Sequence, residues 1–219
     1  MADIKNISEK SSYDYWYNLM PIKRRERIDA YKPQNSKLLS LAAGILIKKA
    51  LENEGITEYE ISENSMGKPY LVTSDKVFFN LSHSGEKAIL AISDDEVGID
   101  IEKDKTFNQK LTEFVFDDNE IQQAMATSQD TDCLFTALWT AKESIMKFYG
   151  KGISMEPKKI HLAMDFEGGF TIRNIEGDYD YSKLVLARKN IDDYQITICS
   201  KGDTFGNVKI TDVFDAIGR

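Results

Sequence analysis

The segment from Val97 to Glu102, with the sequence VGIDIE, constrains this chain most, because it places two carboxylates two residues apart in a stretch typical of a buried strand. Side chains alternate across a strand, so Asp100 and Glu102 share one face while Ile99 and Ile101 share the other. Like charges this close destabilise each other unless a cation lies nearby. Mg²⁺ is usually held by one or two carboxylates with waters and substrate phosphates. The segment therefore predicts a cation site and indicates phosphate chemistry.

Composition limits the classes of protein that remain. With 219 residues, 42% of them hydrophobic and 29% charged, the chain has the length and balance of an ordinary globular protein. Its net charge of −8 argues against a nonspecific nucleic-acid binder, so an anionic ligand must meet a local basic patch. Cys133 and Cys199 lie far apart without metal-ligand spacing, which predicts neither a disulfide framework nor a zinc site. No signal-like or membrane-spanning apolar run is present, so we expect a cytoplasmic protein.

The order of predicted elements indicates an α+β fold built from two similar halves. Apolar residues recur at helical spacing over 36–51, and the runs 77–81 and 88–92 then predict a hairpin whose turn contains Ser82-His83-Ser84-Gly85. A second helix is predicted over 131–149, closed by Gly150, and short alternating strands follow it to about residue 200. Each half therefore has a short antiparallel sheet packed on a long helix, with residues 1–97 in the first and 98–219 in the second.

The second helix carries a further candidate for chemistry. Glu143 and Lys147 stand four residues apart, and Trp139 precedes Glu143 by four, so the three share one helix face. On this helix alone a surface ion pair between Glu143 and Lys147 is the favoured interpretation. A position near Asp100 and Glu102 would instead make Glu143 a third carboxylate of the cation site.

Histidines and a basic run supply the candidates for anion binding. His83 lies between two serines beside the carboxylate strand and can meet a phosphate there, although most single histidines are structural. His161 lies in an alternating strand, where we expect no functional role. The run from Pro21 to Arg27 contains four basic residues, which suits either a solvated helix face or a phosphate contact.

Three segments in order resemble the signatures of the Sfp-type 4′-phosphopantetheinyl transferases. They are Asn80–Ser84 (NLSHS), Gly98–Glu102 (GIDIE) and Trp139–Lys147 (WTAKESIMK), preceded by Gly67-Lys68-Pro69 and followed by Gly150-Lys151-Gly152. The resemblance implies a holo-[acyl-carrier-protein] synthase type of transferase. Such an enzyme moves the 4′-phosphopantetheine arm of coenzyme A to a serine of an acyl, peptidyl or polyketide carrier protein and releases adenosine 3′,5′-bisphosphate.

The resemblance also implies roles for particular residues. Asp100, Glu102 and Glu143 would hold Mg²⁺, and Glu143, or a water on the metal, would take the proton of the serine. Lys147 and His83 would complete the catalytic set. The implied contacts to coenzyme A are Lys68, Ser82, His83, Lys147, Lys23, Arg27 and Lys37. The family often has arginine where Lys37 stands, and lysine keeps the charge but loses the bidentate geometry.

Architecture and partners follow from the same resemblance. Longer members of the superfamily are pseudo-two-fold pairs of halves in one chain, which implies a monomer with its site between the halves. Residues 1–97 would supply the coenzyme A phosphate-binding elements, and residues 98–219 the metal site and the carrier-docking region. Two other interpretations remain open: a coenzyme A or nucleotide-binding module without activity, and a Mg²⁺-dependent phosphohydrolase.

The docking of a carrier protein is expected to rely on apolar contact. Carrier proteins are generally acidic, and this chain is itself acidic with a pI of about 4.9, so long-range attraction is absent. A cluster of large apolar residues after the carboxylate strand is one candidate surface, with core packing as the alternative. Its members are Phe114, Val115, Phe116, Ile121 and Met125.

Overall fold

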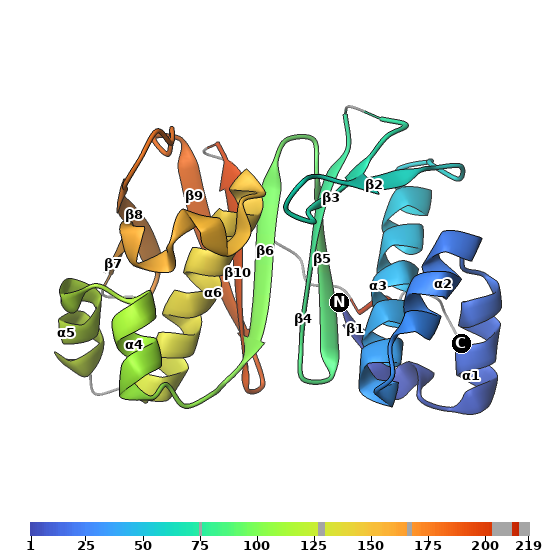
Figure 1. The fold of residues 1–219 in the computed structure, drawn as a ribbon, viewed down its shortest axis with the longest axis horizontal. Helices are drawn as coiled ribbons and strands as arrows, with labels where there is room; N and C mark the ends of the chain where they lie inside the picture. Colours follow the sequence, from blue (N-terminus) through green and yellow to red (C-terminus); the bar gives the residue numbers. More distant parts are fainter. Residues whose placement is uncertain (75, 127–129, 166–167, 203–211, 215–219) are drawn as a thin grey trace.

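The computed structural model describes the chain except for residues 75, 127–129, 166–167, 203–211 and 215–219 (Figure 1). The elements of the first half are β1 (Ala2–Asp3), η1 (Ile4–Ile7), α1 (Lys10–Asn18), α2 (Ile22–Ala30), α3 (Gln34–Asn53), β2 (Ile61–Glu63), β3 (Pro69–Leu71), β4 (Phe78–Ser84) and β5 (Lys87–Ser93). Those of the second are β6 (Val97–Lys103), α4 (Gln109–Val115), α5 (Asp118–Ala126), α6 (Thr131–Tyr149), η2 (Gly152–Met155), η3 (Pro157–Lys159), β7 (Ile160–Met164), β8 (Phe170–Ile175), β9 (Leu184–Ile191) and β10 (Tyr194–Lys201).

In the described residues, two three-stranded antiparallel sheets form the middle of the molecule. One has the order β1-β5-β4 and the other β6-β10-β9, and two small two-stranded sheets, β2-β3 and β7-β8, flank them. Figure 1 shows the long helix α3 beside the first sheet and the long helix α6 beside the second. The predicted α+β fold is therefore confirmed.

Both predicted long helices are present: α6 has the predicted bounds, whereas α3 begins two residues before and ends two residues after the predicted range 36–51. In α3 the apolar residues fall on the buried face, and Pro33 precedes the first turn. In α6 the Asp130 carboxylate accepts from the N–H of Asp132, and Gly150 ends the helix in the left-handed conformation with φ of 62°. Helix α6 carries buried residues on nearly all sides, because it lies between the β6-β10-β9 sheet and α5.

The hairpin differs from the prediction at its turn. Strand β4 extends through Ser84, with His83 opposite Ala88 and Ser84 opposite Lys87, so only Gly85 and Glu86 form the turn. Gly85 has φ of 56°, which lets two residues reverse the chain. His83 is therefore a strand residue, and the prediction that it lies in a turn was wrong.

Strands β4 and β6 are neighbouring edges of the two sheets, and side chains join them. The Oδ1 atom of Asn80 accepts from the N–H of Ile99 at 2.9 Å, and the Oγ atom of Ser82 accepts from the N–H of Ile101 at 3.3 Å. Farther along, the Oγ atom of Ser84 accepts from Lys103 N–H at 3.1 Å. Polar side chains at every second residue of β4 thus replace the backbone carbonyls of a normal ladder.

The apolar residues predicted as a candidate docking surface differ in their exposure to solvent. Val115 and Phe116 are fully buried against α6, and Ile121 packs on the same core. Phe114 is 58% exposed and Met125 is 71% exposed. Core packing is therefore correct for three of the five residues, and only Phe114 and Met125 remain available to a partner.

The core of the first half also receives a segment from the end of the chain. Val213 packs in the cluster around α3, and its N–H donates to the carbonyl of Met1. In the part of the chain that the structure describes, no helix has the length and apolar character needed to cross a membrane.

Candidate functional site

Strand β6 lies directly on α6 because Gly98 has no side chain. A Cβ atom at Gly98 would lie 2.0 Å from the carbonyl oxygen of Ser144 and 2.4 Å from the backbone nitrogen of Phe148. No other residue fits there without moving the strand or the helix. This close approach brings Asp100 and Glu102 against the α6 face that carries Trp139, Glu143 and Lys147.

Asp100 is buried and only half satisfied. Its Oδ1 atom accepts from Ser82 Oγ at 2.7 Å and from Lys147 Nζ at 2.6 Å. Its Oδ2 atom is shielded from solvent and has no hydrogen-bond partner among the described residues. Burial raises the pKa of Asp100, although the charge of Lys147 opposes that shift.

Glu102 faces the same helix one turn earlier. Its Oε1 atom accepts from the indole N–H of Trp139 at 3.1 Å and from Lys105 Nζ at 3.0 Å. Its Oε2 atom accepts from Ser84 Oγ at 2.9 Å. Asp100 and Glu102 therefore share one face of β6, as their spacing predicts.

Glu143 lies on α6 between the residues that bind the two strand carboxylates. Trp139, four residues earlier, contacts Glu102, and Lys147, four residues later, contacts Asp100. Burial, followed by the negative charge of Asp100, raises the pKa of Glu143 to about 7. The interpretation of Glu143 and Lys147 as an isolated surface ion pair is wrong, because Lys147 pairs with Asp100.

The raised pKa of Glu143 predicts a pH-dependent stability difference. Glu143 carries a pKa of about 7 in the folded chain against an ordinary value of 4.5, so folding favours its proton. As the pH rises through this window, the unfolded chain ionises first and the native state loses stability. Glutamine does not titrate, so the Glu143→Gln variant should gain stability relative to the wild type between pH 5 and pH 8.

Urea unfolding in EDTA at several pH values measures this difference. Glu54, which is exposed, supplies the matched Glu54→Gln control for the loss of one carboxylate. The raised pKa of Glu143 is refuted if the stability difference between Glu143→Gln and the wild type does not change with pH.

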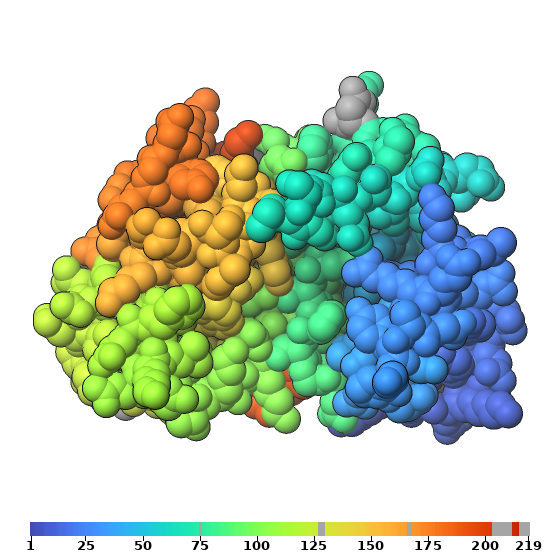
Figure 2. Space-filling view, viewed as in Figure 1, coloured from blue at the N-terminus to red at the C-terminus, as the bar shows by residue number. Residues whose placement is uncertain are grey.

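A cavity of about 1040 Å³ opens next to these carboxylates. It lies between α2, α3 and the β2-β3 segment, and Figure 2 shows the surface where the blue helices meet this teal segment. Lys23, Arg24 and Arg27 of α2 line it, and so does His83 at the end nearest Asp100. Partial burial, followed by the positive charge of Lys147, lowers the pKa of His83. The cavity thus has a basic wall, and His83 links it electrostatically to Lys147, Asp100 and Glu102.

Some of the predicted contacts to coenzyme A do not line the cavity, among them Lys68, Lys37 and Ser82. The ammonium of Lys68 donates to Glu96 at 2.5 Å and to the carbonyls of Val97 at 3.3 Å and Phe148 at 2.9 Å, which uses all its hydrogens. Lys68 therefore ties the start of β6 to the end of α6. Lys37 is not among the cavity-lining residues.

The hydroxyl of Ser82 is also fully used. It donates to Asp100 and accepts from Lys147 Nζ at 2.9 Å and from the N–H of Ile101. Ser82 therefore orients Asp100 and Lys147, whereas its neighbour His83 faces the cavity.

Arg24 is the cavity residue that the sequence analysis missed. Its side chain crosses α3 at Gly44, where an added Cβ atom would lie 3.0 Å from Arg24 Nε. Burial lowers the pKa of Arg24 to about 10, which leaves it charged at neutral pH. The signal was present, since Met20, Arg24, Arg27 and Tyr31 recur at helical spacing and all line the cavity.

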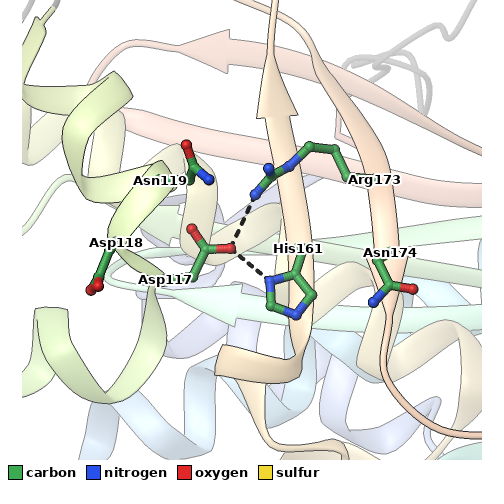
Figure 3. Close-up of a pocket in the computed structure, with 6 residues that line it drawn as sticks. All are labelled: Asp117, Asp118, Asn119, His161, Arg173 and Asn174. Atoms are coloured by element: carbon green, nitrogen blue, oxygen red, sulfur yellow. Dashed lines mark hydrogen bonds and ion pairs between the residues drawn. The ribbon is translucent and has the colours of Figure 1, made fainter.

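A second polar cluster lies at the other end of the second half. Figure 3 shows the Asp117 carboxylate between the side chains of His161 and Arg173. The Oδ2 atom of Asp117 lies 2.6 Å from His161 Nδ1 and 3.1 Å from Arg173 Nη2, and the three residues line a hollow of about 400 Å³. His161 Nε2 lies 3.0 Å from Glu176. Burial opposes the charged imidazole, but Asp117 and Glu176 outweigh it and raise the pKa of His161. This cluster joins α5 to β7 and β8 and shares no residue with the cavity.

Comparison with known proteins identifies similar chains. The family model described as the 4′-phosphopantetheinyl transferase superfamily matches residues 96–199. The chain is 26% identical over 188 residues to the 4′-phosphopantetheinyl transferase Sfp of Bacillus subtilis, covering 83% of this chain and 82% of that protein. It is 36% identical over 132 residues to the 4′-phosphopantetheinyl transferase gsp of Aneurinibacillus migulanus, covering 57% and 51%. A solved holo-[acyl-carrier-protein] synthase from Neisseria meningitidis is 16% identical, with a TM-score of 0.41 and coverage of 49% and 98%.

Proposed function

Because the chain belongs to the 4′-phosphopantetheinyl transferase superfamily, we propose that it moves the phosphopantetheine arm of coenzyme A to a serine of a carrier protein and releases adenosine 3′,5′-bisphosphate. The chain is a transferase enzyme of this family, and the predicted resemblance to the Sfp-type 4′-phosphopantetheinyl transferases is confirmed. The observation that carries the proposal is the meeting of two sites at His83. His83 lines a cavity with a basic wall, and its side chain also interacts electrostatically with Lys147 of α6 and with Asp100 and Glu102 of β6.

The carboxylate face fits Mg²⁺ by its chemistry. Its donors are oxygen atoms, and the orphaned Oδ2 atom of Asp100 is a buried acceptor that a cation would satisfy. Among the described residues, no group of three His, Cys, Asp or Glu side chains is close enough together to hold a metal ion. We assign Asp100, Glu102 and Glu143 as the residues that would hold Mg²⁺, which when bound would stabilise charge developing on the cleaved pyrophosphate.

The remaining roles belong to side chains of this chain. Lys147 uses two of its three N–H bonds on Ser82 and Asp100, and the third is available to a phosphate oxygen. Glu143 has a pKa near neutrality, which suits a general base that accepts the proton of the serine hydroxyl. His83, Lys23 and Arg27 line the cavity that would hold coenzyme A.

The two halves of the chain supply different parts of the site, which supports the assigned roles of residues 1–97 and 98–219. Cavity residues come from α2, α3 and β4 of the first half, whereas the carboxylates come from β6 and α6 of the second. The site thus lies where residues 1–97 meet residues 98–219 within one chain. We accordingly propose that the enzyme acts as a monomer in the cytoplasm.

We place the carrier-docking surface at the two exposed apolar side chains that follow β6. Phe114 lies on α4 and Met125 on α5, both in the segment between the carboxylate strand and the carboxylate helix. Because carrier and enzyme are both acidic, apolar burial rather than charge should drive their contact. Replacing Phe114 and Met125 with serine should raise the KM for the carrier about tenfold, with the KM for coenzyme A and kcat unchanged.

Tyr15, which is 61% exposed on α1 of the other half, supplies the matched Tyr15→Ser control. Steady-state kinetics with each substrate varied in turn gives the two KM values. An unchanged carrier KM in the Phe114→Ser/Met125→Ser variant would exclude this surface.

The release of nucleotide separates the proposed reaction from its alternatives. The enzyme is incubated with coenzyme A and Mg²⁺, with and without an unmodified carrier protein, and adenosine 3′,5′-bisphosphate is followed chromatographically. Transfer predicts release only when the carrier is present. Release without the carrier, together with free phosphopantetheine, indicates a phosphohydrolase, and no release in either case indicates a binding module.

A further inference from the structure

Two ion pairs join opposite walls of the cavity. Lys23 Nζ of α2 lies 3.2 Å from an Oε1 atom of Glu60, and Arg27 Nη1 donates to an Oε1 atom of Glu63. All four residues line the cavity, and Glu63 belongs to β2 while Glu60 directly precedes it. Two of the three basic side chains of the α2 wall are therefore held by carboxylates of this chain.

Arg24 is different from its two neighbours. Its Nη2 atom is shielded from solvent and has no hydrogen-bond partner within the described part of the chain. A guanidinium nitrogen without an acceptor costs free energy, because its hydration is lost and not replaced. A phosphate oxygen is a good replacement, since a guanidinium can bind it through two parallel hydrogen bonds.

We infer that Glu60 and Glu63 act as built-in competitors for a phosphate of the ligand, which would bind Lys23, Arg27 and the unpartnered Arg24. This inference rests on the proposed function, in which the ligand is coenzyme A. Within the chain, Lys23 and Arg27 pair with these carboxylates, and an entering phosphate would exchange these partners for its own oxygens. Glu60 and Glu63 thereby weaken the binding of any ligand that cannot replace them.

The competing pairs are suited to exchange because both are exposed. The side chains of Lys23 and Glu60 are 83% and 59% exposed, and those of Arg27 and Glu63 are 53% and 42% exposed. Exposed pairs contribute little to stability, so their loss should not unfold the chain. Both carboxylates also repel an incoming phosphate, which adds to the competition.

Isothermal titration of the full chain with coenzyme A and Mg²⁺, without carrier protein, tests the inference. The Glu60→Gln/Glu63→Gln variant should bind coenzyme A about three- to tenfold more tightly than the wild type. Its matched control is Glu54→Gln/Glu58→Gln, which removes the same charge from two exposed positions outside the cavity and should change the Kd less than about twofold.

The Arg24→Gln variant should have the opposite effect on the affinity for coenzyme A. It should raise the Kd for coenzyme A at least about tenfold, whereas Arg25→Gln, on the same helix but outside the cavity lining, should leave the Kd near that of the wild type. Equal Kd values for Glu60→Gln/Glu63→Gln and its control, or for Arg24→Gln and Arg25→Gln, overturn the inference. A wild-type chain that does not bind coenzyme A overturns the proposed function as well, which separates the two failures.

Discussion

Replacing Asp100 with asparagine is expected to lower the rate of carrier modification about 1000-fold while the chain stays folded. Asparagine keeps the shape of the side chain and can still accept from Ser82 and Lys147, whose contacts to Asp100 are 2.7 and 2.6 Å. It removes the negative charge that a Mg²⁺ ion would need. Because burial already disfavours the ionised carboxyl, neutralising it should not destabilise the native state.

The initial rate at saturating coenzyme A, Mg²⁺ and carrier protein measures this loss, and thermal unfolding reports on the fold. Asp95→Asn is the matched control, because Asp95 is exposed in the loop before β6, where its Oδ1 atom accepts from the N–H of Glu96 at 2.7 Å and lies 3.7 Å from Lys201 Nζ. A rate for Asp100→Asn within a few-fold of the control would refute the assigned role of Asp100.

Lys142→Met is expected to lower the free energy of unfolding by about 3 to 5 kcal/mol. The Lys142 side chain is fully buried beside Glu143, and its ammonium donates to Glu120 at 2.6 Å and to the carbonyls of Val115 at 2.9 Å and Pro157 at 3.1 Å. Methionine fills a similar volume but leaves the Glu120 carboxylate buried without a cation. Urea unfolding measures the loss.

A second substitution separates the unpaired charge from general loss of packing. In Lys142→Met/Glu120→Gln the uncompensated charge is gone, and glutamine can still accept from the N–H of Leu162, which Glu120 binds at 2.9 Å. This variant should recover at least about 1 kcal/mol of the loss. Lys159→Met, which breaks an exposed pair with Glu156, should cost less than about 0.5 kcal/mol. The account fails if the double variant is no more stable than Lys142→Met.

Elements defined by local periodicity were predictable from the sequence. The helix over 131–149 has its apolar residues at helical spacing and a glycine at its end, and the structure begins and ends α6 at those residues. The shared face of Asp100 and Glu102 follows from the period of a strand, and the structure places both against α6. Each of these predictions depends only on residues close together in the chain.

Contacts between residues distant in sequence could not be predicted. Nothing near Lys68 indicates that its ammonium meets the carbonyls of Val97 and Phe148, and nothing near Ser82 indicates that its hydroxyl meets Asp100 and Lys147. Both contacts form only when β4, β6 and α6 are assembled. A residue type that suits a phosphate equally suits a backbone carbonyl or a carboxylate, so tertiary structure decides between them.

Burial explains the remaining differences. Phe114 and Phe116 are two residues apart and equally apolar, yet Phe114 is exposed and Phe116 packs on Phe107 and Phe135 in the core. Arg24 and Arg27 likewise belong to one basic run, but only Arg27 has a carboxylate within reach among the described residues. Which member of such a pair is free for a ligand depends on the packing of α2 against α3 and β2.

The most direct test of the proposed transfer is the intact mass of an unmodified carrier protein after incubation with this enzyme, coenzyme A and Mg²⁺. We predict a mass increase equal to one phosphopantetheine group on the carrier, and no increase on a carrier whose acceptor serine is replaced by alanine. An unchanged carrier mass, with coenzyme A either intact or hydrolysed, would contradict the proposed function.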